Sequence, residues 1–406
     1  MLRDALNKLR SWMAAPAGAP RSALVLSGGG ARASYQAGVL QYMAEVFPDT
    51  AFEILTGVSA GAINAAHIAN HTGTFREAAD NLTASWNRIT AAEIFEEESS
   101  VAFLRRILGR SKIDKLHPSE SVLQVGEGQA LLNTAPLRAY LNEKLGAQDG
   151  VLTGVGTNIE RGTLRAFCIT ATNYLTGQSV SWVDGTDFEH WERPTRLGIQ
   201  STLTVDHIMA STALPLLFPA VHLGSGWFGD GGIRQTAPLS PAIHLGADRI
   251  LAISTRYNRS RGEADVPAVV GYPPAAQVMG LLMNAIFLDV LDQDAITLRR
   301  INRLVTALPP YRRGELRPVK LLMLRPSRDI GRLASEYDLH LRGALRLLTR
   351  GLGSAETKSP DWLSMLLFDA DYIARLMQIG WEDARRQHAR IADFLDDDLP
   401  LMKDAA

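Results

Sequence analysis

Ser59 stands in the segment Gly57-Val58-Ser59-Ala60-Gly61, which has the GxSxG pattern of many hydrolytic enzymes. A short apolar run precedes it and an alanine-rich stretch follows it. Flanking glycines tolerate the strained backbone of a sharp strand-to-helix turn and leave the serine hydroxyl uncovered. The N-terminus of the following helix also directs free N–H groups toward negative charge that develops near the serine. The pattern predicts a nucleophilic serine for acyl transfer.

A run of three glycines lies about thirty residues earlier, in Ser27-Gly28-Gly29-Gly30-Ala31-Arg32. Consecutive glycines between a strand and a helix expose backbone N–H groups, which can bind an oxyanion or a nucleotide phosphate. The nucleotide interpretation is disfavoured, because Ala33 stands where GxGxxG needs its third glycine and no GxxxxGK[ST] occurs. A purely structural turn is the third interpretation.

A third motif, Gly229-Asp230-Gly231-Gly232, follows the aromatic pair Trp227-Phe228. An exposed aspartate is a poor base at neutral pH, whereas apolar surroundings raise the pKa of a carboxyl group toward the useful range. Taken alone, Asp-Gly-Gly is most often an ordinary turn.

Histidine offers an alternative base. A Ser-Asp-His triad in that chain order requires a histidine after Asp230, and both His244 and His388 satisfy this order. Neither lies in a recognisable loop motif. None of the nine histidines belongs to an HExxH segment, and no calcium-binding loop occurs, so no metal site is predicted.

The elements that must position these motifs alternate between strand and helix. Strands are predicted at 23–26, 52–55, 164–171, 178–183, 249–254 and 319–324, with a hairpin at 220–223 and 227–229. Helices are predicted at about 31–47, after 61, over most of 75–145, and at 277–305, 333–350 and 361–395. This alternation is typical of an α/β fold with a parallel sheet.

The composition is that of an ordinary globular protein of 406 residues, with 46% hydrophobic and 21% charged residues. Lysine and arginine (42) nearly balance aspartate and glutamate (43), which gives no electrostatic attraction to nucleic acid. The single cysteine, Cys168, excludes an internal disulfide and fits a reducing compartment. No apolar run is long enough to span a membrane. A cytoplasmic location is expected.

Residues 1–20 form an amphipathic segment and a linker. Leu2, Leu6, Leu9 and Met13 fall on one helical face, and basic residues lie off it. Lys8 and Arg10 interrupt any export signal. One hypothesis is weak, peripheral contact with a membrane surface; the other is a helix that docks on the protein's own core.

In their order and spacing the three motifs resemble the patatin-like phospholipase family, bacterial type. The resemblance covers Ala23 to Ser254 and includes Ala210-Ser211-Thr212-Ala213-Leu214-Pro215. It implies a three-layer α/β/α sandwich with a mostly parallel central sheet, followed by a C-terminal helical extension. By the same resemblance Ser59 is the nucleophile and Asp230 its base. Gly28, Gly29 and Gly30 form the oxyanion hole, aided by Arg32. Ala33 departs from the glycine of many relatives.

The expected protein is therefore a serine acyl hydrolase that cleaves fatty-acyl esters of lipids through a Ser59–Asp230 dyad and an acyl-enzyme, without cofactor. The alternatives are a non-catalytic lipid-binding or scaffold relative and the histidine triad. The chain is divided into residues 1–20, a catalytic domain at 21–255 and a mostly helical region at 256–406. The lipid head group and the oligomeric state are left open.

Overall fold

The computed structural model describes residues 20–96, 130, 132–265, 272, 275–340 and 361–396. The amphipathic face expected from Leu2 to Met13 lies outside these residues, as do 97–129 and 341–350 of the expected helical regions. None of the described helices combines the length and the apolar character needed to cross a bilayer.

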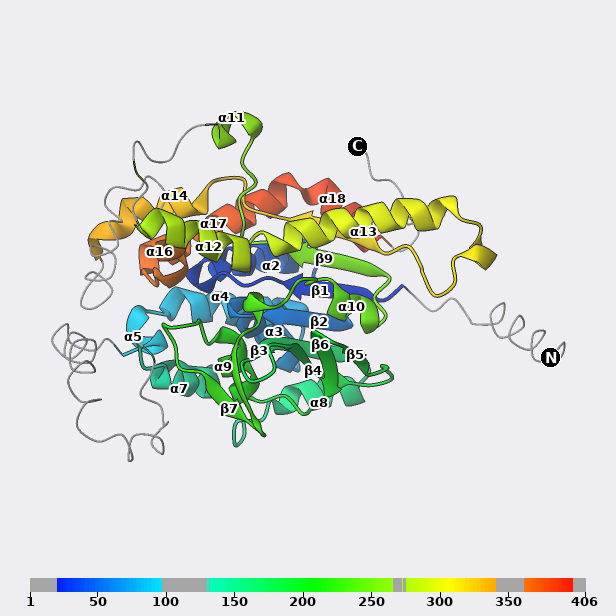
Figure 1. The fold of residues 1–406 in the computed structure, drawn as a ribbon, viewed down its shortest axis with the longest axis horizontal. Coiled ribbons are helices and arrows are strands. Elements are labelled where there is room, and N and C mark those ends of the chain that lie inside the picture. Colours follow the sequence, from blue (N-terminus) through cyan, green and yellow to red (C-terminus); the bar gives the residue numbers. More distant parts are fainter. Residues whose placement is uncertain are drawn as a thin grey trace.

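The described residues form one ten-stranded, mostly parallel sheet (Figure 1). Its strands are β1 (Ser22–Leu26), β2 (Ile54–Val58), β3 (Ala166–Asn173), β4 (Ser179–Gly185), β5 (Trp191–Arg193), β6 (Arg196–Gln200), β7 (Val221–Leu223), β8 (Gly226–Asp230), β9 (Arg249–Ile253) and β10 (Lys320–Leu324). The order is β10-β9-β1-β2-β3-β4-β6-β5, and the β7–β8 hairpin pairs with the end of β3. The strands from β10 to β3 are parallel, and β4 runs antiparallel to β3.

Helices cover both faces of the sheet. The early ones are η1 (Gly30–Ala33), α2 (Ser34–Val46), α3 (Ala60–Asn70), α4 (Phe75–Arg88), α5 (Ala91–Ile94), α7 (Ala135–Lys144), α8 (Thr153–Glu160), α9 (Val205–Thr212), η2 (Gly231–Ile233) and α10 (Ser240–His244). The later ones are α11 (Arg261–Ala264), α12 (Ala275–Phe287), α13 (Val290–Ala307), η3 (Pro310–Arg312), α14 (Ile330–Ala334), η4 (Ser335–His340), α16 (Asp361–Leu366), α17 (Ala370–Arg386) and α18 (His388–Leu395).

Alternate residues of β1 face two separate cores, which defines the three layers. Leu24 and Leu26 pack with apolar side chains of α2, α3 and α17, whereas Ala23 and Val25 pack with those of α10 and α13. A parallel strand that is buried on both faces reads as a continuous apolar run, which is what β1 shows. The α/β/α sandwich expected from the resemblance is confirmed.

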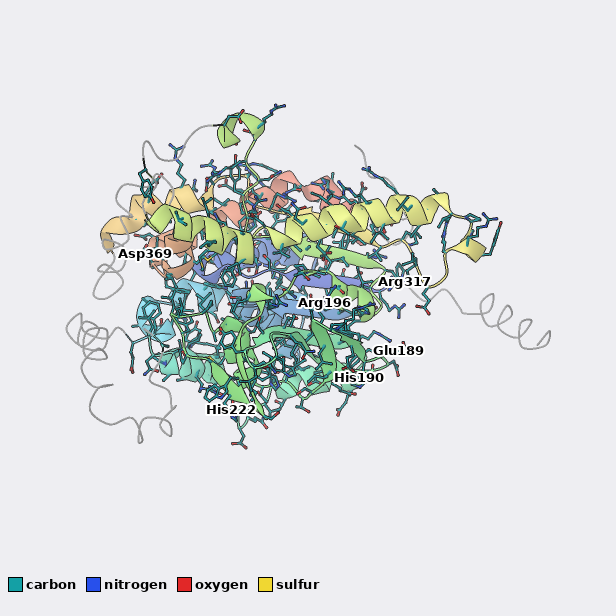
Figure 2. All side chains as sticks on the ribbon, viewed as in Figure 1. Glu189, His190, Arg196, His222, Arg317 and Asp369 are labelled. Atoms are coloured by element: carbon teal, nitrogen blue, oxygen red, sulfur yellow. The ribbon has the colours of Figure 1, made fainter. Side chains whose placement is uncertain are left out.

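Several element boundaries differ from those predicted. β2 continues to Val58, beyond the predicted end at Leu55, because residues 56–58 pair with Cys168–Thr170 of β3. The helix predicted at 277–305 is two helices, α12 and α13, and 361–395 contains three. α16 ends at Leu366, and Asp369 then begins α17, because its side chain accepts hydrogen bonds from the backbone N–H groups of Asp371 and Tyr372. Figure 2 shows Asp369 beside α16.

The segments on either side of residue 255 share this architecture. β10 pairs with β9 in parallel along its whole length. α17 crosses α2 so closely that a β-carbon at Gly38 would collide with the carbonyl oxygen of Met377, and one at Gly380 with that of Tyr35. The domain division at 255 stays a prediction, and the residues after it complete the sheet and add helices to both of its faces, α17 to one and α13 to the other.

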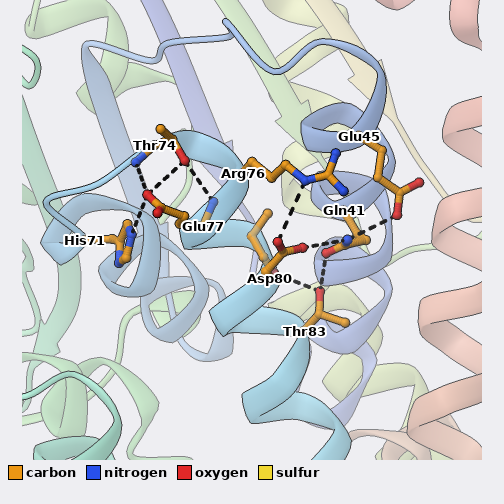
Figure 3. A network of polar contacts seen from close by, with 9 residues as sticks. Gln41, Glu45, His71, Thr74, Arg76, Glu77, Asp80 and Thr83 are labelled. Atoms are coloured by element: carbon orange, nitrogen blue, oxygen red, sulfur yellow. Dashed lines mark hydrogen bonds and ion pairs between the residues drawn. The ribbon is translucent and has the colours of Figure 1, made fainter.

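Helix α4 is fixed at its start by a capping box. The hydroxyl of Thr74 accepts a hydrogen bond from the N–H of Glu77, and the carboxylate of Glu77 accepts one from the N–H of Thr74. Further along, Asp80 accepts a hydrogen bond from the side-chain amide of Gln41 on α2 (Figure 3). These contacts set the position of α4, whose C-terminal turn lines the candidate site described next.

Candidate active site

Ser59 lies at the turn between β2 and α3, with backbone angles φ 54° and ψ −136°. Residues without a glycine's freedom rarely adopt such angles, which cost about 1–3 kcal/mol and persist only where the surroundings enforce them. Close packing enforces them here, because a β-carbon at Gly61 would collide with the carbonyl oxygen of Leu26. The helix therefore starts directly against the end of β1, and the serine is held in the sharp turn that GxSxG predicts.

Asp230 ends strand β8 and is completely buried. Its Oδ1 accepts a hydrogen bond of 2.8 Å from the N–H of Gly232. Burial raises the pKa of Asp230 to about 7, and hydrogen bonding from the Ser59 side chain and the Gly232 N–H opposes that rise. Oδ2 has no well-formed hydrogen bond to any described residue. Ser59 is thus adjacent to Asp230, but the hydrogen bond between their side chains is not well formed, as is common in active sites before substrate binds.

A serine outside the three motifs joins these two loops. The hydroxyl of Ser211, at the end of α9, accepts a hydrogen bond of 2.9 Å from the N–H of Ser59 and donates one of 2.6 Å to the carbonyl of Thr170. Two residues later, the carbonyl of Ala213 accepts a hydrogen bond from the N–H of Asp230. The segment from Ala210 to Pro215 is part of the family resemblance, but its sequence does not predict these contacts.

The glycine loop passes beside the serine. A β-carbon at Gly28 would lie 2.9 Å from Cβ of Ser59. Gly29 has φ 151°, and a β-carbon there would lie 2.5 Å from the hydroxyl of Thr255, which donates a hydrogen bond to the carbonyl of Gly28. Among the described residues, none accepts a hydrogen bond from the backbone N–H of Gly28, Gly29 or Gly30. These groups can therefore receive a negatively charged oxygen formed beside Ser59.

Ser59 opens into an apolar cavity with an empty volume of about 600 Å³, part of it open to solvent. Helices α3, α4, α7 and α16 contribute most of its wall, which consists mainly of apolar side chains: Ala60, Ile63, Trp86, Ile89, Ile94, Leu137, Leu141, Leu214, Phe218, Met365, Leu366 and Phe368. Such a space can bind a long apolar group next to Ser59.

The sequence profile of the family described as "Patatin-like phospholipase" matches residues 24–243, more than half of the chain. The chain belongs to this family. Membership supports a lipid hydrolase, and the patatin-like domain contains every motif discussed above. None of the curated proteins compared with the chain matches it.

Solved structures with a similar arrangement have low sequence identity. VipD from Legionella pneumophila is 12% identical, with 92% of this chain and 67% of VipD aligned and a TM-score of 0.38. Human GIVD cytosolic phospholipase A2, in complex with methyl gamma-linolenyl fluorophosphonate, is 13% identical, with 93% and 59% aligned and a TM-score of 0.41. ExoU of Pseudomonas aeruginosa, in complex with SpcU, is 15% identical, with 92% and 79% aligned and a TM-score of 0.26. The chain spans about three fifths of the human protein, and TM-scores this low transfer no function.

Arg32 of this patatin-like domain is turned toward the C-terminal helices. It is buried, and its Nε donates a hydrogen bond of 2.5 Å to the hydroxyl of Ser364 on α16. Within the described residues it is not part of the cavity wall. Ser59, Asp230 and the three glycines are thus brought together, whereas the guanidinium of Arg32 connects η1 to α16.

The two candidate histidine bases lie elsewhere in the patatin-like fold. His244 stacks on Trp191 with ring centroids 4.9 Å apart. Nδ1 of His388 lies 3.0 Å from the hydroxyl of Tyr42. Among the described residues, neither histidine shares a hydrogen bond with Ser59 or Asp230.

A buried amide network, missed in the sequence, supports the glycine loop. The side-chain amide of Gln36 donates hydrogen bonds to the carbonyls of Ser27 and Ile253. Asn64 on α3 donates to Gln36 Oε1 and accepts from the indole N–H of Trp86, a cavity residue. The network links the glycine loop, the serine-bearing helix and the cavity wall. No sequence signal marks it, because its members are polar residues scattered along different helices.

Proposed function

We propose that this protein is a serine acyl hydrolase that cleaves fatty-acyl esters of lipids, of the phospholipase A or lysophospholipase type. One observation carries the proposal: Ser59 adjoins a buried carboxyl with a pKa near 7 at the mouth of an apolar cavity. A base titrating near neutral pH beside a strained serine is suited to nucleophilic catalysis.

In the first step Asp230 accepts the proton of the Ser59 hydroxyl while Oγ attacks the ester carbonyl. The N–H groups of the glycine loop stabilise the oxyanion, and the N-terminus of α3 adds its positive dipole end. The alcohol product, a lysolipid or glycerol derivative, leaves with the proton from Asp230. Water, deprotonated by Asp230, then releases the fatty acid from the acyl-enzyme, so no cofactor is required.

Arg32 has a positioning role in this proposal. Its hydrogen bond to Ser364 holds the glycine loop against α16. We therefore propose that Gly28, Gly29 and Gly30 stabilise the oxyanion directly and that Arg32 aids them by holding their loop in place.

Reaction with a fluorophosphonate probe, which labels only activated serines, tests the dyad directly. The wild type should label, whereas Ser59→Ala and Asp230→Asn should each lose nearly all labelling and ester hydrolysis while still unfolding in one cooperative transition. Since the two groups act as one unit, the double variant should be little worse than either single variant.

Two controls separate the alternatives. His244→Ala and His388→Ala should stay within about tenfold of wild-type activity, a change of roughly 1.4 kcal/mol; a thousandfold loss in a folded variant of either would establish the triad. A wild-type protein that neither labels nor hydrolyses esters would be the lipid-binding scaffold instead.

A further inference from the structure

His67 is a polar side chain in the wall of the apolar cavity. It lies on α3, on the same helical face as Ala60 and Ile63, and all three line the cavity together with Ser59. Positions three and four residues apart fall on one side of a helix, so this row runs from the nucleophile along the cavity wall.

The imidazole of His67 has no hydrogen bond to any described residue. Only 7% of the residue is exposed, and no partner for either ring nitrogen is found on α3 or on the helices packed against it. Buried histidines elsewhere in the chain do have partners; His207, for example, lies 2.8 Å from the hydroxyl of Thr204. Because a polar group that a ligand covers must be hydrogen-bonded or it costs free energy, an unpaired imidazole in the cavity wall favours a ligand that carries a polar group at this depth.

Its protonation state limits what that group can be. Burial, helped by nearby His71, lowers the pKa of His67 to about 4, so the ring is neutral at physiological pH. A neutral imidazole carries one donor and one acceptor nitrogen. It therefore suits a hydroxyl group, which can both accept and donate, and provides no charge to attract a carboxylate or phosphate.

The helix sets where along the ligand this contact falls. Eight residues separate Ser59 from His67, a rise of about 12 Å at 1.5 Å per residue. An extended hydrocarbon with C–C bonds of about 1.5 Å reaches that far after roughly eight to ten carbons from the ester carbonyl. The imidazole thus meets the middle of a long acyl chain rather than its head.

We infer that His67 forms a specificity subsite for acyl chains that carry a hydroxyl group near their middle. The inference rests on the proposed function, since it takes the acyl chain of the ester to occupy the cavity. A chain without a hydroxyl group covers the imidazole and leaves it unpaired, whereas a mid-chain hydroxyl pairs with it, so the site discriminates by the cost of an unsatisfied polar group.

The test compares three nitrophenyl esters in the same mixed micelles: octadecanoate, 10-hydroxyoctadecanoate and 2-hydroxyoctadecanoate. The wild type should have a kcat/KM roughly five- to tenfold higher for the 10-hydroxy ester than for octadecanoate, the effect of about one hydrogen bond. The 2-hydroxy ester, whose hydroxyl lies beside the carbonyl, should show no such preference.

Variants of His67 test whether its imidazole causes the preference for the 10-hydroxy ester. His67→Leu should lower the ratio to one or below, and His67→Gln should retain part of it. Ile63→Val, one turn nearer the serine, is the matched apolar control: it also changes the cavity wall and can change both rates, but it should keep the wild-type ratio. A wild-type ratio of one, or a ratio that His67→Leu leaves unchanged, would overturn the inference.

A binding measurement keeps this outcome separate from failure of the proposed function. If the wild type cleaves no ester, the proposed hydrolase is wrong, but the subsite can still be tested by calorimetric titration of the Ser59→Ala protein with free 10-hydroxyoctadecanoic and octadecanoic acids. Tighter binding of the hydroxy acid that His67→Leu abolishes would support the subsite, and equal affinities would refute it.

Discussion

A carboxyl group buried as completely as that of Asp230 destabilises the folded state when it ionises, because the unfolded chain keeps the same group in water. The folded pKa of about 7 lies above the ordinary value of 3.8. The resulting loss in the free energy of unfolding is therefore absent below about pH 4, grows as the pH rises toward 7, and is constant above pH 7. At its plateau it amounts to roughly 4 kcal/mol.

Replacing this carboxyl should stabilise the protein while inactivating it. Asp230→Asn should melt at a higher temperature than the wild type at pH 8, and the gain should shrink progressively toward pH 4. Thermal melts over that range measure the effect. A gain that does not depend on pH would mean that Asp230 is not the titrating group.

Ionisation of Asp230, which lowers the stability of the protein, should raise its catalytic activity. Only the deprotonated carboxylate can accept the Ser59 proton, so kcat/KM should rise about tenfold per pH unit below 7 and level off above it. A soluble short-chain ester measures this without interference from vesicle charge. A profile that is flat from pH 5 to 9 would exclude Asp230 as the base.

At the scale of elements, the crossing of α2 and α17 depends on two glycines whose backbones approach the opposite helix. Gly38→Ala places a methyl group against the carbonyl oxygen of Met377, so the helices must separate, at an expected cost of about 1–3 kcal/mol or more. The control is Gly156→Ala in α8, where nothing lies within 4 Å and alanine should stabilise by about 0.5–1 kcal/mol. Denaturant unfolding of both variants measures the contrast; equal effects would contradict the close crossing.

The elements also show how far sequence reasoning reaches. The glycine loop, GxSxG and Asp-Gly-Gly are local patterns. The residues that form each turn are adjacent in the sequence, so these turns and the strands before them could be predicted. The pair β5 and β6 was missed, because three to five residues at a sheet edge carry little periodic signal. The break between α12 and α13 was also missed: Asp289, which precedes α13, is held by an ion pair with Arg256 that no helical pattern reveals.

Side chains whose contact depends on the tertiary arrangement could not be predicted at all. Ser211 lies 152 residues from Ser59, and its hydroxyl accepts a hydrogen bond from the N–H of Ser59. Nothing in the segment around Ser211 predicts that contact. Arg32 was identified by its place after the glycines, yet its direction depends on α16, hundreds of residues later. Motif spacing locates the reacting atoms, whereas the fold decides which polar groups support them.

At the scale of the whole molecule, residues 1–20 carry the amphipathic segment that is predicted to contact a membrane surface. Its four apolar residues are too few for irreversible insertion, so attachment should be weak and sensitive to salt. Deleting 1–20 should lower activity on anionic vesicles and leave hydrolysis of a soluble short-chain ester intact. Equal loss on both substrates, with a lower melting temperature, would show instead that the segment docks on the core.

The contact between the glycine loop and α16 also sets the time at which the candidate site can be completed while the protein is being synthesised. A β-carbon at Gly30 would collide with the carbonyl oxygen of Met365, and Arg32 bonds to Ser364, 332 residues further along the chain. At translation rates of about 5–20 residues per second, the ribosome needs roughly 20 to 60 seconds to make that intervening chain. A nascent chain therefore carries Ser59 and the glycine loop long before the packing that completes them, and the candidate site remains unfinished until α16 has emerged.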